Sequence, residues 1–561
     1  MIMGLAALDV AVIVLYLVAI TTIGLRSSRS VKTSGDYFMG GRRFGKLLMV
    51  AKAFGVGTRV DHVVAITGAS YQIGLSGVWY QWLYIFSTPF FWLIAPIYRR
   101  LRYLTTGDFF DERYGRAAGV AYTIGALLFF TIEIGMLLRG TGTTIQAITG
   151  GAVSAEVIIV LTTLVFVGYG TAGGLVAAVS TKILQGFMLL LLSVVLLPFA
   201  FVAVGGLSSL HQKLPESMFA LFGASEVTPF VVLMLTINGL AGVVALPHHM
   251  AIGGAGRSEI SCRTGWTYGN VVKRFATLAW ALTGVFAAAL LPSIAGGARE
   301  EALGAMILQL LPQGLVGLMI AAMVASLMAV CDAYMVDGSA LFTRNLLGRV
   351  GDTKATGDIR IARISSVGIV VVGILMAFLL PDVISGLKII WKIMAFFGIP
   401  FWMAIFWKRG NRYGLWASLV TATAVSLITE SLGWTLADQI SLYLPAGIAA
   451  FVLVSWMTPP EPDEKIRTFS LLLHTPVGEE WRLDQAGIRS ILVGRSEAAV
   501  GQRAGVPLEE QGHSLLLVDL LDLRRKFSFN RYRVDIVGFL AATAMIGAII
   551  GLAAVLARLG G

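Results

Sequence analysis

The chain has 561 residues, of which 57% are apolar and only 13% are charged. Soluble domains carry about 25% charged residues, so this composition excludes a water-soluble globular protein. A membrane-spanning helix needs about 20 apolar residues, and the chain is long enough for well over ten of them. The formal net charge of +11 requires no nucleic-acid partner if Lys and Arg gather on one side of a lipid bilayer.

Apolar runs along the chain predict an all-α polytopic membrane protein with about 14 transmembrane helices. The first run lacks a basic leader and a small-residue cleavage site, so we interpret it as a retained helix. The expected helices span residues 5–25, 47–71, 77–98, 117–147, 153–170, 180–204, 229–250, 275–293, 314–343, 361–380, 386–407, 413–433, 441–458 and 534–557.

Basic residues gather in alternate loops between these helices, which indicates the cytoplasmic side. With this alternation both termini lie outside, and we expect an integral protein of a bacterial inner membrane. The basic loop residues are Arg26, Arg29, Lys32, Arg42, Arg43, Lys46, Arg99, Arg100, Arg102, Arg113, Arg116, Arg257, Arg263, Lys273, Arg274, Arg344, Arg349, Lys354, Arg360, Arg363, Lys408, Arg409 and Arg412.

The sequence divides into three parts at a hydrophilic stretch near the C-terminus. We expect a membrane domain of 13 helices over residues 1–459, a cytoplasmic segment over 460–533 and a last helix within 534–561. The segment follows the helix-breaking residues Thr458, Pro459 and Pro460. About 74 residues of mixed charge give a marginal core, so both a linking appendage and a regulatory module remain open.

Two of the expected helices carry residues that favour an interruption at membrane depth. The second helix contains the run from Phe54 to His62, with two glycines and three ionisable residues, and the seventh contains Asn238 to Gly242 followed by Pro247. Interrupted helices expose backbone groups to ions and solutes in transporters. Their spacing predicts two inverted repeats, helices 2–6 and 7–11, although glycines also permit close helix packing.

Several stretches resemble the sodium/solute symporter family, in the order of that family and over residues 36–412. The resemblance implies a LeuT-like fold of five-plus-five inverted repeats, a transporter rather than an enzyme, and a small-molecule solute coupled to Na+. The stretches are Asp36 to Arg42, Arg59 to Tyr71, Thr105 to Gly115, Gly170 to Leu175 with Thr181 and Gln185, Leu311 to Leu318, and Phe406 to Asn411.

The resemblance also implies a sodium site that this chain has altered. Backbone carbonyls would come from Gly55, Thr58 and Ser326, but the family's paired hydroxyls fall on Ala329 and Val330. Sodium is a hard cation that prefers oxygen ligands, so alkyl side chains there predict a weak or absent sodium site.

Arg59 lies where family members have a small polar residue, beside the expected ion. An arginine at mid-bilayer costs about 3 kcal/mol or more, so it needs a partner. We expect Arg59 to replace the ion and to pair with Asp332, which makes transport sodium-independent or proton-linked. Proton coupling would use Asp332, or Asp61 with His62, as titrating groups; an ion pair that only fixes packing is the other interpretation.

The expected substrate site combines the two interrupted helices. His62 matches a position that contacts solute in sugar-transporting relatives, with Asp61 and Asn238 as further polar candidates. Their sugar contacts on the second interrupted helix fall at Gly239, Gly242 and Val243, which disfavours a sugar. A small polar organic solute or anion is therefore expected.

Three further points complete the sequence prediction. There is no nucleotide-binding loop, zinc-like spacing or nucleophile elbow, so no cofactor is expected beyond Na+ or H+ as coupling ion. Conventional sodium symport is one alternative function, and a transporter-like membrane sensor is another. The sequence leaves open whether the protein is a monomer or a homo-oligomer.

Overall fold

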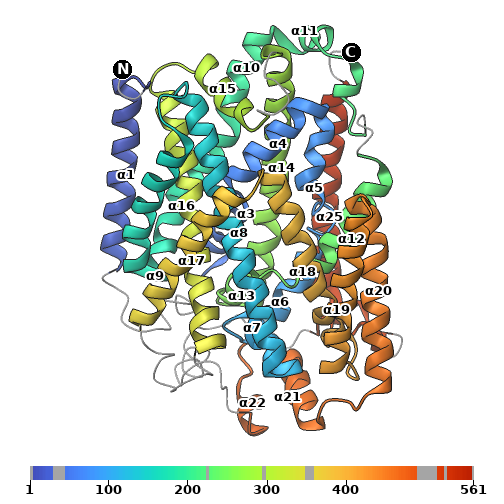
Figure 1. Ribbon diagram of the computed structural model, residues 1–561. Coiled ribbons are helices and arrows are strands. Elements are labelled where there is room, and N and C mark those ends of the chain that lie inside the picture. The colour runs from blue at the N-terminus through green and yellow to red at the C-terminus, as the bar shows by residue number, and fades with distance from the viewer. Residues whose placement is uncertain are drawn as a thin grey trace.

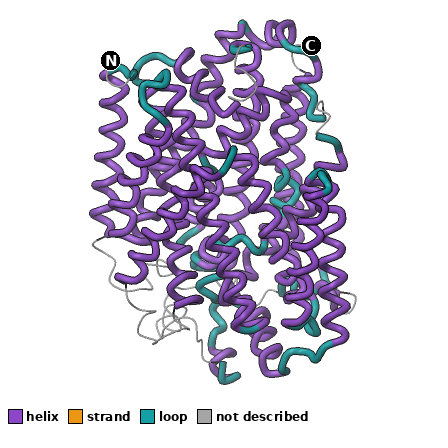
Figure 2. The backbone as a smooth tube through the Cα atoms, viewed as in Figure 1, coloured by secondary structure: helices purple, strands orange, loops and turns teal. Residues whose placement is uncertain are grey.

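A computed structural model describes residues 4–28, 44–222, 227–292, 299–347, 359–488, 514–523 and 527–558 of the chain. The described part is a bundle of helices that run mostly along one direction (Figure 1). Figure 2 shows helices and loops without strands over these ranges, apart from an isolated bridge between Phe44 and Gly256. The predicted all-α fold is confirmed.

The helical segments follow the predicted order except at the helices predicted over 153–170 and 180–204, because the structure has one continuous helix from Ala155 to Val194 there. Their bounds are α1 (Ala7–Ser28), α3 (Lys46–Gly57), α4 (Val60–Ile73), η2 (Gly74–Val78), α5 (Trp79–Trp82), α6 (Phe90–Leu101), α7 (Thr106–Tyr114), α8 (Arg116–Ile148), α9 (Ala155–Val194), α10 (Leu196–Val204), α11 (Gly206–Lys213), η3 (Glu216–Met218), α12 (Pro229–Val243), α13 (His248–Gly254), α14 (Glu259–Leu290), η4 (Arg299–Glu301), α15 (Ala302–Leu310), α16 (Leu315–Leu341), η5 (Phe342–Leu346), α17 (Ile359–Leu379), α18 (Val383–Phe406), α19 (Arg412–Ser431), α20 (Leu436–Met457), α21 (Asp463–His474), α22 (Trp481–Gln485), η9 (Leu520–Asp522) and α25 (Phe529–Arg558).

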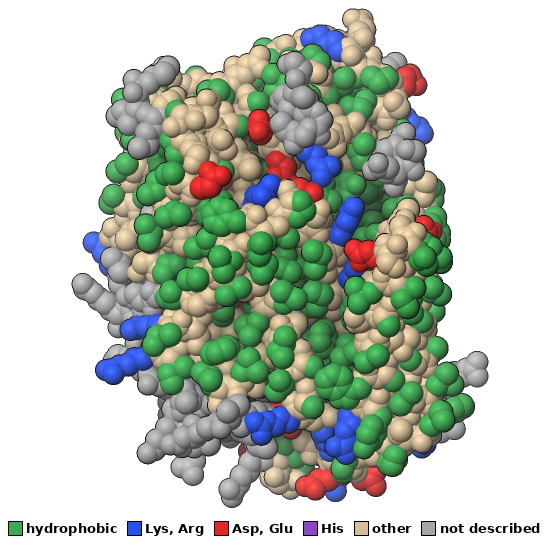
Figure 3. Space-filling view, viewed as in Figure 1, with side chains coloured by type: hydrophobic (Ala, Val, Ile, Leu, Met, Phe, Trp, Pro, Cys, Tyr) green, Lys and Arg blue, Asp and Glu red, His purple; other side chains and the backbone are tan. Residues whose placement is uncertain are grey.

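The outer helices present an apolar surface suited to lipid. On the face in Figure 3, a broad hydrophobic region separates charged side chains near the two ends. Within the described residues, eight helices are long and apolar enough to cross a membrane, or nine if α12 and α13 form one bent span. α1 begins and α25 ends at the same end of the bundle, the upper one in Figure 1. The count of about 14 and the outside termini stay predictions.

Helix α16 lies in the core, and its first turn is fixed by a side chain from α1. The Asp9 carboxylate accepts hydrogen bonds from the backbone N–H of Gly314 (2.6 Å) and of Gly317 (2.8 Å). These N–H groups have no partner within the helix, and a negative charge suits a helix N-terminus. α1 therefore holds in place a helix that borders the centre of the bundle.

The expected interruptions of the second and seventh helices are present. Thr58 and Arg59 are extended between α3 and α4, with φ/ψ of −103°/122° and −140°/151°. α12 and α13 meet at an angle of 67°. The helix expected over 77–98 is also interrupted, which the sequence analysis missed: α5 ends at Trp82 and α6 begins at Phe90.

The eighth expected helix begins much earlier than predicted. α14 starts at Glu259 rather than near residue 275, and the Ser258 side chain caps it by accepting a hydrogen bond from Ser261 N. The basic residues Lys273 and Arg274, assigned from sequence to a cytoplasmic loop, therefore lie inside a buried helix. Both residues therefore have to be considered as part of the site.

Residues from the hydrophilic segment pack against the lower end of the bundle in Figure 1, where α21 and α22 lie. α21 contacts both α6 and α7, and its Phe469 ring lies 5.6 Å from the ring of Phe109. The described start of the 460–533 segment is thus a docked appendage.

Four buried or partly buried charged residues form the docking cluster at that end: Arg100, Arg102, Glu259 and Glu480. Arg100 pairs with Glu259 at 2.9 Å, and Arg102 pairs with Glu480 at 2.9 Å. Arg102 also donates to the carbonyls of Thr475 (3.2 Å) and Pro476 (2.9 Å). Each guanidinium is therefore matched by a carboxylate, and these contacts tie α22 to the end of α6.

At the upper end, η4 bridges α4 and α18. Arg299 pairs with Asp382 at 3.3 Å and donates to the side chain of Gln72 at 3.3 Å. The Glu300 carboxylate accepts a hydrogen bond from Val383 N at 2.9 Å. This bridge closes the bundle above the interrupted helix α3–α4.

Candidate functional site

A buried cavity lies between the two interrupted helices. Its volume is about 80 Å³, and its lining includes Arg59 and His62 beside the first interruption and Val243, Leu246 and His248 around the second. Helices α5, α6, α8, α14, α16 and α18 contribute further residues to the wall. The two interruptions that the sequence predicted to form one site are thus brought together.

Arg59 is the centre of a network of charged and polar groups. Its guanidinium binds Asp61 through two hydrogen bonds, at 3.1 and 2.9 Å, and forms an ion pair with Glu133 from α8. It also donates to Tyr334 Oη at 3.0 Å and to His62 Nε2 at 2.6 Å. Because a guanidinium can only donate, His62 accepts at Nε2, which places its ring proton on Nδ1.

The partners of Arg59 correct one prediction. Asp61 and Glu133 hold the guanidinium, whereas the sequence analysis expected Asp332. Asp332 is buried on α16, and its charge acts on Tyr16 of α1. Asp61 follows the helix interruption by two residues, so the start of α4 turns its carboxylate back towards Arg59. The sequence of α16 alone could not show that Asp61, and not Asp332, faces the guanidinium.

Two basic residues of α14, Lys273 and Arg274, also line the cavity. Arg274 donates to Thr88 Oγ1 at 3.2 Å and, through Nη1, to the backbone and side-chain oxygens of Gln81 at 3.0 Å each. The Lys273 side chain is buried and has no hydrogen bond or ion pair to any described residue. The sequence offered a signal for them, since Ser258 and Glu259 form a typical helix start.

The remaining predicted substrate residues separate into two groups. His62 and Val243 line the cavity, whereas the Asn238 amide donates to Trp391 O (3.3 Å) and accepts from Tyr443 Oη (2.6 Å). The side chain of Asn238 thus joins α12 to α18 and α20.

Gly239 and Gly242 allow close packing. A Cβ on Gly239 would lie 3.1 Å from the ring of Tyr84, and one on Gly242 would lie 3.0 Å from the backbone nitrogen of Ala395 in α18. A Cβ on Gly398 of α18 would in turn collide with the carbonyl oxygen of Ala241. The glycines of α12 therefore serve helix contact, the alternative that the sequence left open.

The residues expected around the ion are all buried. Thr58 follows the last residue of α3, and Ser326 lies within α16. Neither hydroxyl has a hydrogen-bond partner among the described residues. Gly55, Ala329 and Val330 are enclosed in the same core. Sodium ligation at these positions stays a prediction. Within the described residues, no group of three or more His, Cys, Asp and Glu side chains is arranged to hold a metal ion.

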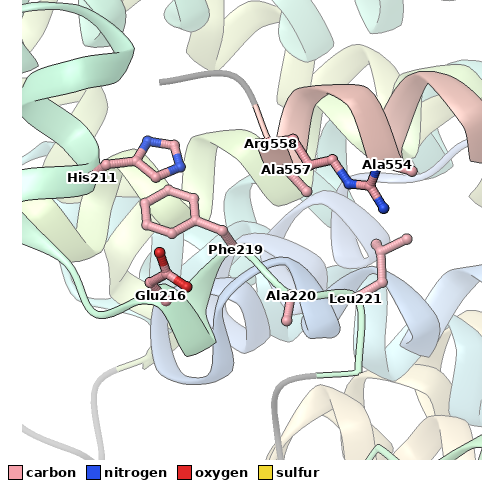
Figure 4. Close-up of a pocket in the computed structure, with 8 residues that line it drawn as sticks. All are labelled: His211, Glu216, Phe219, Ala220, Leu221, Ala554, Ala557 and Arg558. Atoms are coloured by element: carbon pink, nitrogen blue, oxygen red, sulfur yellow. The ribbon is translucent and has the colours of Figure 1, made fainter. Parts of the chain in front are cut away.

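A larger cavity of about 450 Å³ lies at the upper end of the molecule, between η3 and the end of α25 (Figure 4). His211 stacks on Phe219 there, with ring centroids 3.8 Å apart, and Arg558 of α25 lines the opposite side (Figure 4). It lies at the bundle end, away from both helix interruptions. We therefore assign the candidate transport site to the smaller central cavity.

Interrupted helices that flank a buried charged cavity define a secondary transporter. The sequence model of the Sodium:solute symporter family matches residues 37–421, and the chain belongs to this family. It is a transporter and not an enzyme, as the sequence analysis predicted. Two of the stretches that carried the predicted resemblance, Asp36 to Arg42 and Gly170 to Thr181, lie outside the residues whose side chains the structure describes.

The chain is similar at low identity to curated transporters. The chain is 24% identical over 450 residues to the sodium/pantothenate symporter of Haemophilus influenzae, covering 75% of this chain and 91% of the relative. It is 24% identical over 487 residues to the osmoregulated proline transporter OpuE of Bacillus subtilis, covering 82% and 96%.

A solved structure confirms the fold. A Na+-coupled sialic acid symporter in a substrate-bound outward-open state superposes with a TM-score of 0.70 at 19% identity, covering 81% of this chain and 99% of that one. Mhp1, a nucleobase-cation-symport-1 family transporter, superposes with a TM-score of 0.53 at 13% identity, covering 77% and 97%. The predicted LeuT-like architecture is therefore shared.

Proposed function

We propose that the protein is a secondary active transporter in which Arg59 replaces the coupling sodium ion. The observation that carries this proposal is the Arg59 guanidinium at the interruption of α3 and α4, bound by Asp61 and Glu133. The solute is a small polar organic molecule or anion that binds in the central cavity. Transport is sodium-independent or proton-linked, and it proceeds by alternating access.

Electrostatics supports the replacement. A sodium ion about 5 Å from the guanidinium, at an effective dielectric constant of about 20, would be repelled by roughly 3 kcal/mol. The carboxylates of Asp61 and Glu133 are already neutralised in part by Arg59. Ala329 and Val330 offer no side-chain oxygen to compensate a sodium ion for its lost hydration.

Conventional sodium symport is the second candidate. It is favoured by the relatives, whose names include sodium-coupled symporters of pantothenate and sialic acid, and by the buried hydroxyls of Thr58 and Ser326. The two candidates differ in one property that can be measured directly, the response of the protein to sodium.

The test is the melting temperature of the detergent-purified protein in sodium, potassium and choline chloride at two pH values, since a bound ligand raises stability. We expect no sodium-specific shift for the wild type. Arg59→Ser, which vacates the cation position, should gain one. Arg139→Ser is the matched control, because Arg139 donates to the carbonyl of Pro381 away from the cavity. A sodium-specific shift of the wild type would restore conventional symport.

A further inference from the structure

The central cavity contains more positive than negative side chains. Arg59, Lys273 and Arg274 line it, whereas the negative groups at the network are Glu133, which lines it, and Asp61, which binds Arg59. Among the described residues around the cavity, this leaves an excess of one formal positive charge. A charge buried at that depth is costly unless it is paired.

The unmatched charge can be located on α14. Arg59 is held by Asp61 and Glu133, and Arg274 has oxygen partners at Nε and Nη1. Lys273 is only 6% exposed, and its ammonium has no hydrogen bond or ion pair among the described residues. An ammonium has three donors, so this group is prepared to bind an acceptor that the chain does not supply.

From this arrangement we propose that Lys273, assisted by Arg274, binds the carboxylate of a small monoanionic solute. The inference rests on the proposed function, since it names the substrate class of the same cavity. One carboxylate would neutralise the one unmatched positive charge. A charge-assisted N–H···O hydrogen bond from Lys273 would give the solute its orientation.

The rest of the wall indicates an organic anion with a short apolar body. Val56, Val243, Leu246, Leu387 and Ile390 line the cavity together with aromatic rings such as Trp391. The aliphatic side chains among them provide a surface for an apolar body, while Gln81, Tyr84 and Asn270 of the same wall provide polar groups. The volume of about 80 Å³ equals the space of about two or three water molecules. Acetate, propionate and lactate are therefore the solutes to try first.

A purely structural role for Lys273 makes a different prediction. If Lys273 only fills space between helices, an apolar side chain of similar length would be neutral or stabilising, because buried charges are often replaceable by apolar groups. In that case Lys273→Met would not alter the binding of any solute. If Lys273 binds the carboxylate, the same substitution removes the affinity for the anion.

The experiment uses the full chain purified in detergent, with chloride held constant. Binding of acetate, propionate and lactate is followed by intrinsic tryptophan fluorescence, to which Trp391 of the cavity wall contributes, and by the melting temperature. Acetamide and propionamide serve as neutral isosteres. We expect the wild type to bind the carboxylates and not the amides. Lys273→Met should weaken carboxylate binding about 10- to 100-fold, and Lys273→Arg should retain most of it.

Lys213→Met is the matched control, because Lys213 lies at the end of α11 and donates to the carbonyl of Val204. It should leave carboxylate binding unchanged. If Lys273→Met fails to fold, the comparison of carboxylates with amides in the wild type and Lys273→Arg still decides the question.

The outcomes separate this inference from the proposed function. Equal binding of carboxylates and amides, no binding of any carboxylate at millimolar concentration, or unchanged binding in Lys273→Met would each overturn the assignment of Lys273. Repeating the titrations in sodium and in choline tests the proposed function independently. Carboxylate binding that needs sodium would keep the role of Lys273 and remove the role of Arg59.

Discussion

The molecule contains two groups of buried basic residues that differ in how fully their charges are matched. In the docking cluster, Arg100 and Arg102 each have a carboxylate partner, and backbone carbonyls take further N–H groups. In the central cavity, Arg59 is matched but Lys273 is not. The first group is complete as the chain folds. On our proposal the second is completed by a bound solute, and this difference would separate a structural contact from a binding site.

Among substitutions in these two groups of basic residues, we expect the largest loss of stability at Arg59. Arg59→Ala leaves Asp61 and Glu133 buried without a counter-charge, so we expect the free energy of unfolding to fall by about 3–5 kcal/mol. The melting temperature in detergent measures this loss. Adding Glu133→Gln to Arg59→Ala should recover part of the stability, because it removes one uncompensated charge. An unchanged melting temperature for Arg59→Ala would show that the network does not stabilise the fold.

A smaller and more local effect is expected in the docking cluster. Arg102→Ala removes the bonds to Thr475, Pro476 and Glu480 and should cost about 2 kcal/mol, since hydrogen bonds to charged groups contribute about 1.5–3 kcal/mol and Glu480 is partly exposed. Hydrogen exchange should increase over residues 475–485 and stay unchanged around Arg59. Solute binding should also persist. Loss of binding would mean that the appendage acts on the central cavity.

The smallest effect on stability is expected at the ion pair of Arg299 and Asp382. This pair is partly exposed, so it can be compared with the two buried groups. Burial alone would raise the pKa of Asp382, but hydrogen bonds from Ser385 and the charge of Arg299 hold it below its usual range. Its ionised form therefore stabilises the fold above about pH 4, and this stabilisation is lost as the pH falls further through the lowered pKa. Melting temperatures below pH 4 should converge for the wild type and Asp382→Asn. A constant difference would contradict this linkage.

The arrangement of the helices was easier to predict from the sequence than the positions of the buried charged residues. The interruption at Thr58 and Arg59 was predictable because glycines and ionisable residues rarely occur together in an apolar run unless the helix breaks there. The wall containing Lys273 was missed because a rule based on basic loops assigns every Lys and Arg to the membrane surface. That rule cannot identify a basic residue that lies inside the helix bundle. The N-cap residue Ser258 did mark the start of α14.

The partners of Arg59 show a second limit of sequence reasoning. The sequence analysis expected Asp332 as the partner of Arg59, but whether Asp332 or Glu133 reaches the guanidinium depends on how α8 and α16 face the interruption. Such facing is set by packing between helices far apart in the chain. The hydrogen bonds of the Asn238 side chain to Trp391 and Tyr443 show the same limit, because both partners come from later helices.

The backbone contact between α12 and α18 restricts how the carrier can open. Gly242 and Gly398 let the two helices approach so closely that a Cβ on either glycine would lie 3.0 Å or less from the backbone of the other helix. Interlocked backbones resist sliding past one another, so a shear movement at this contact would require the helices to separate first. We therefore expect α12 to swing together with α18 as one rigid arm, with the unwound residues 244–247 as its hinge.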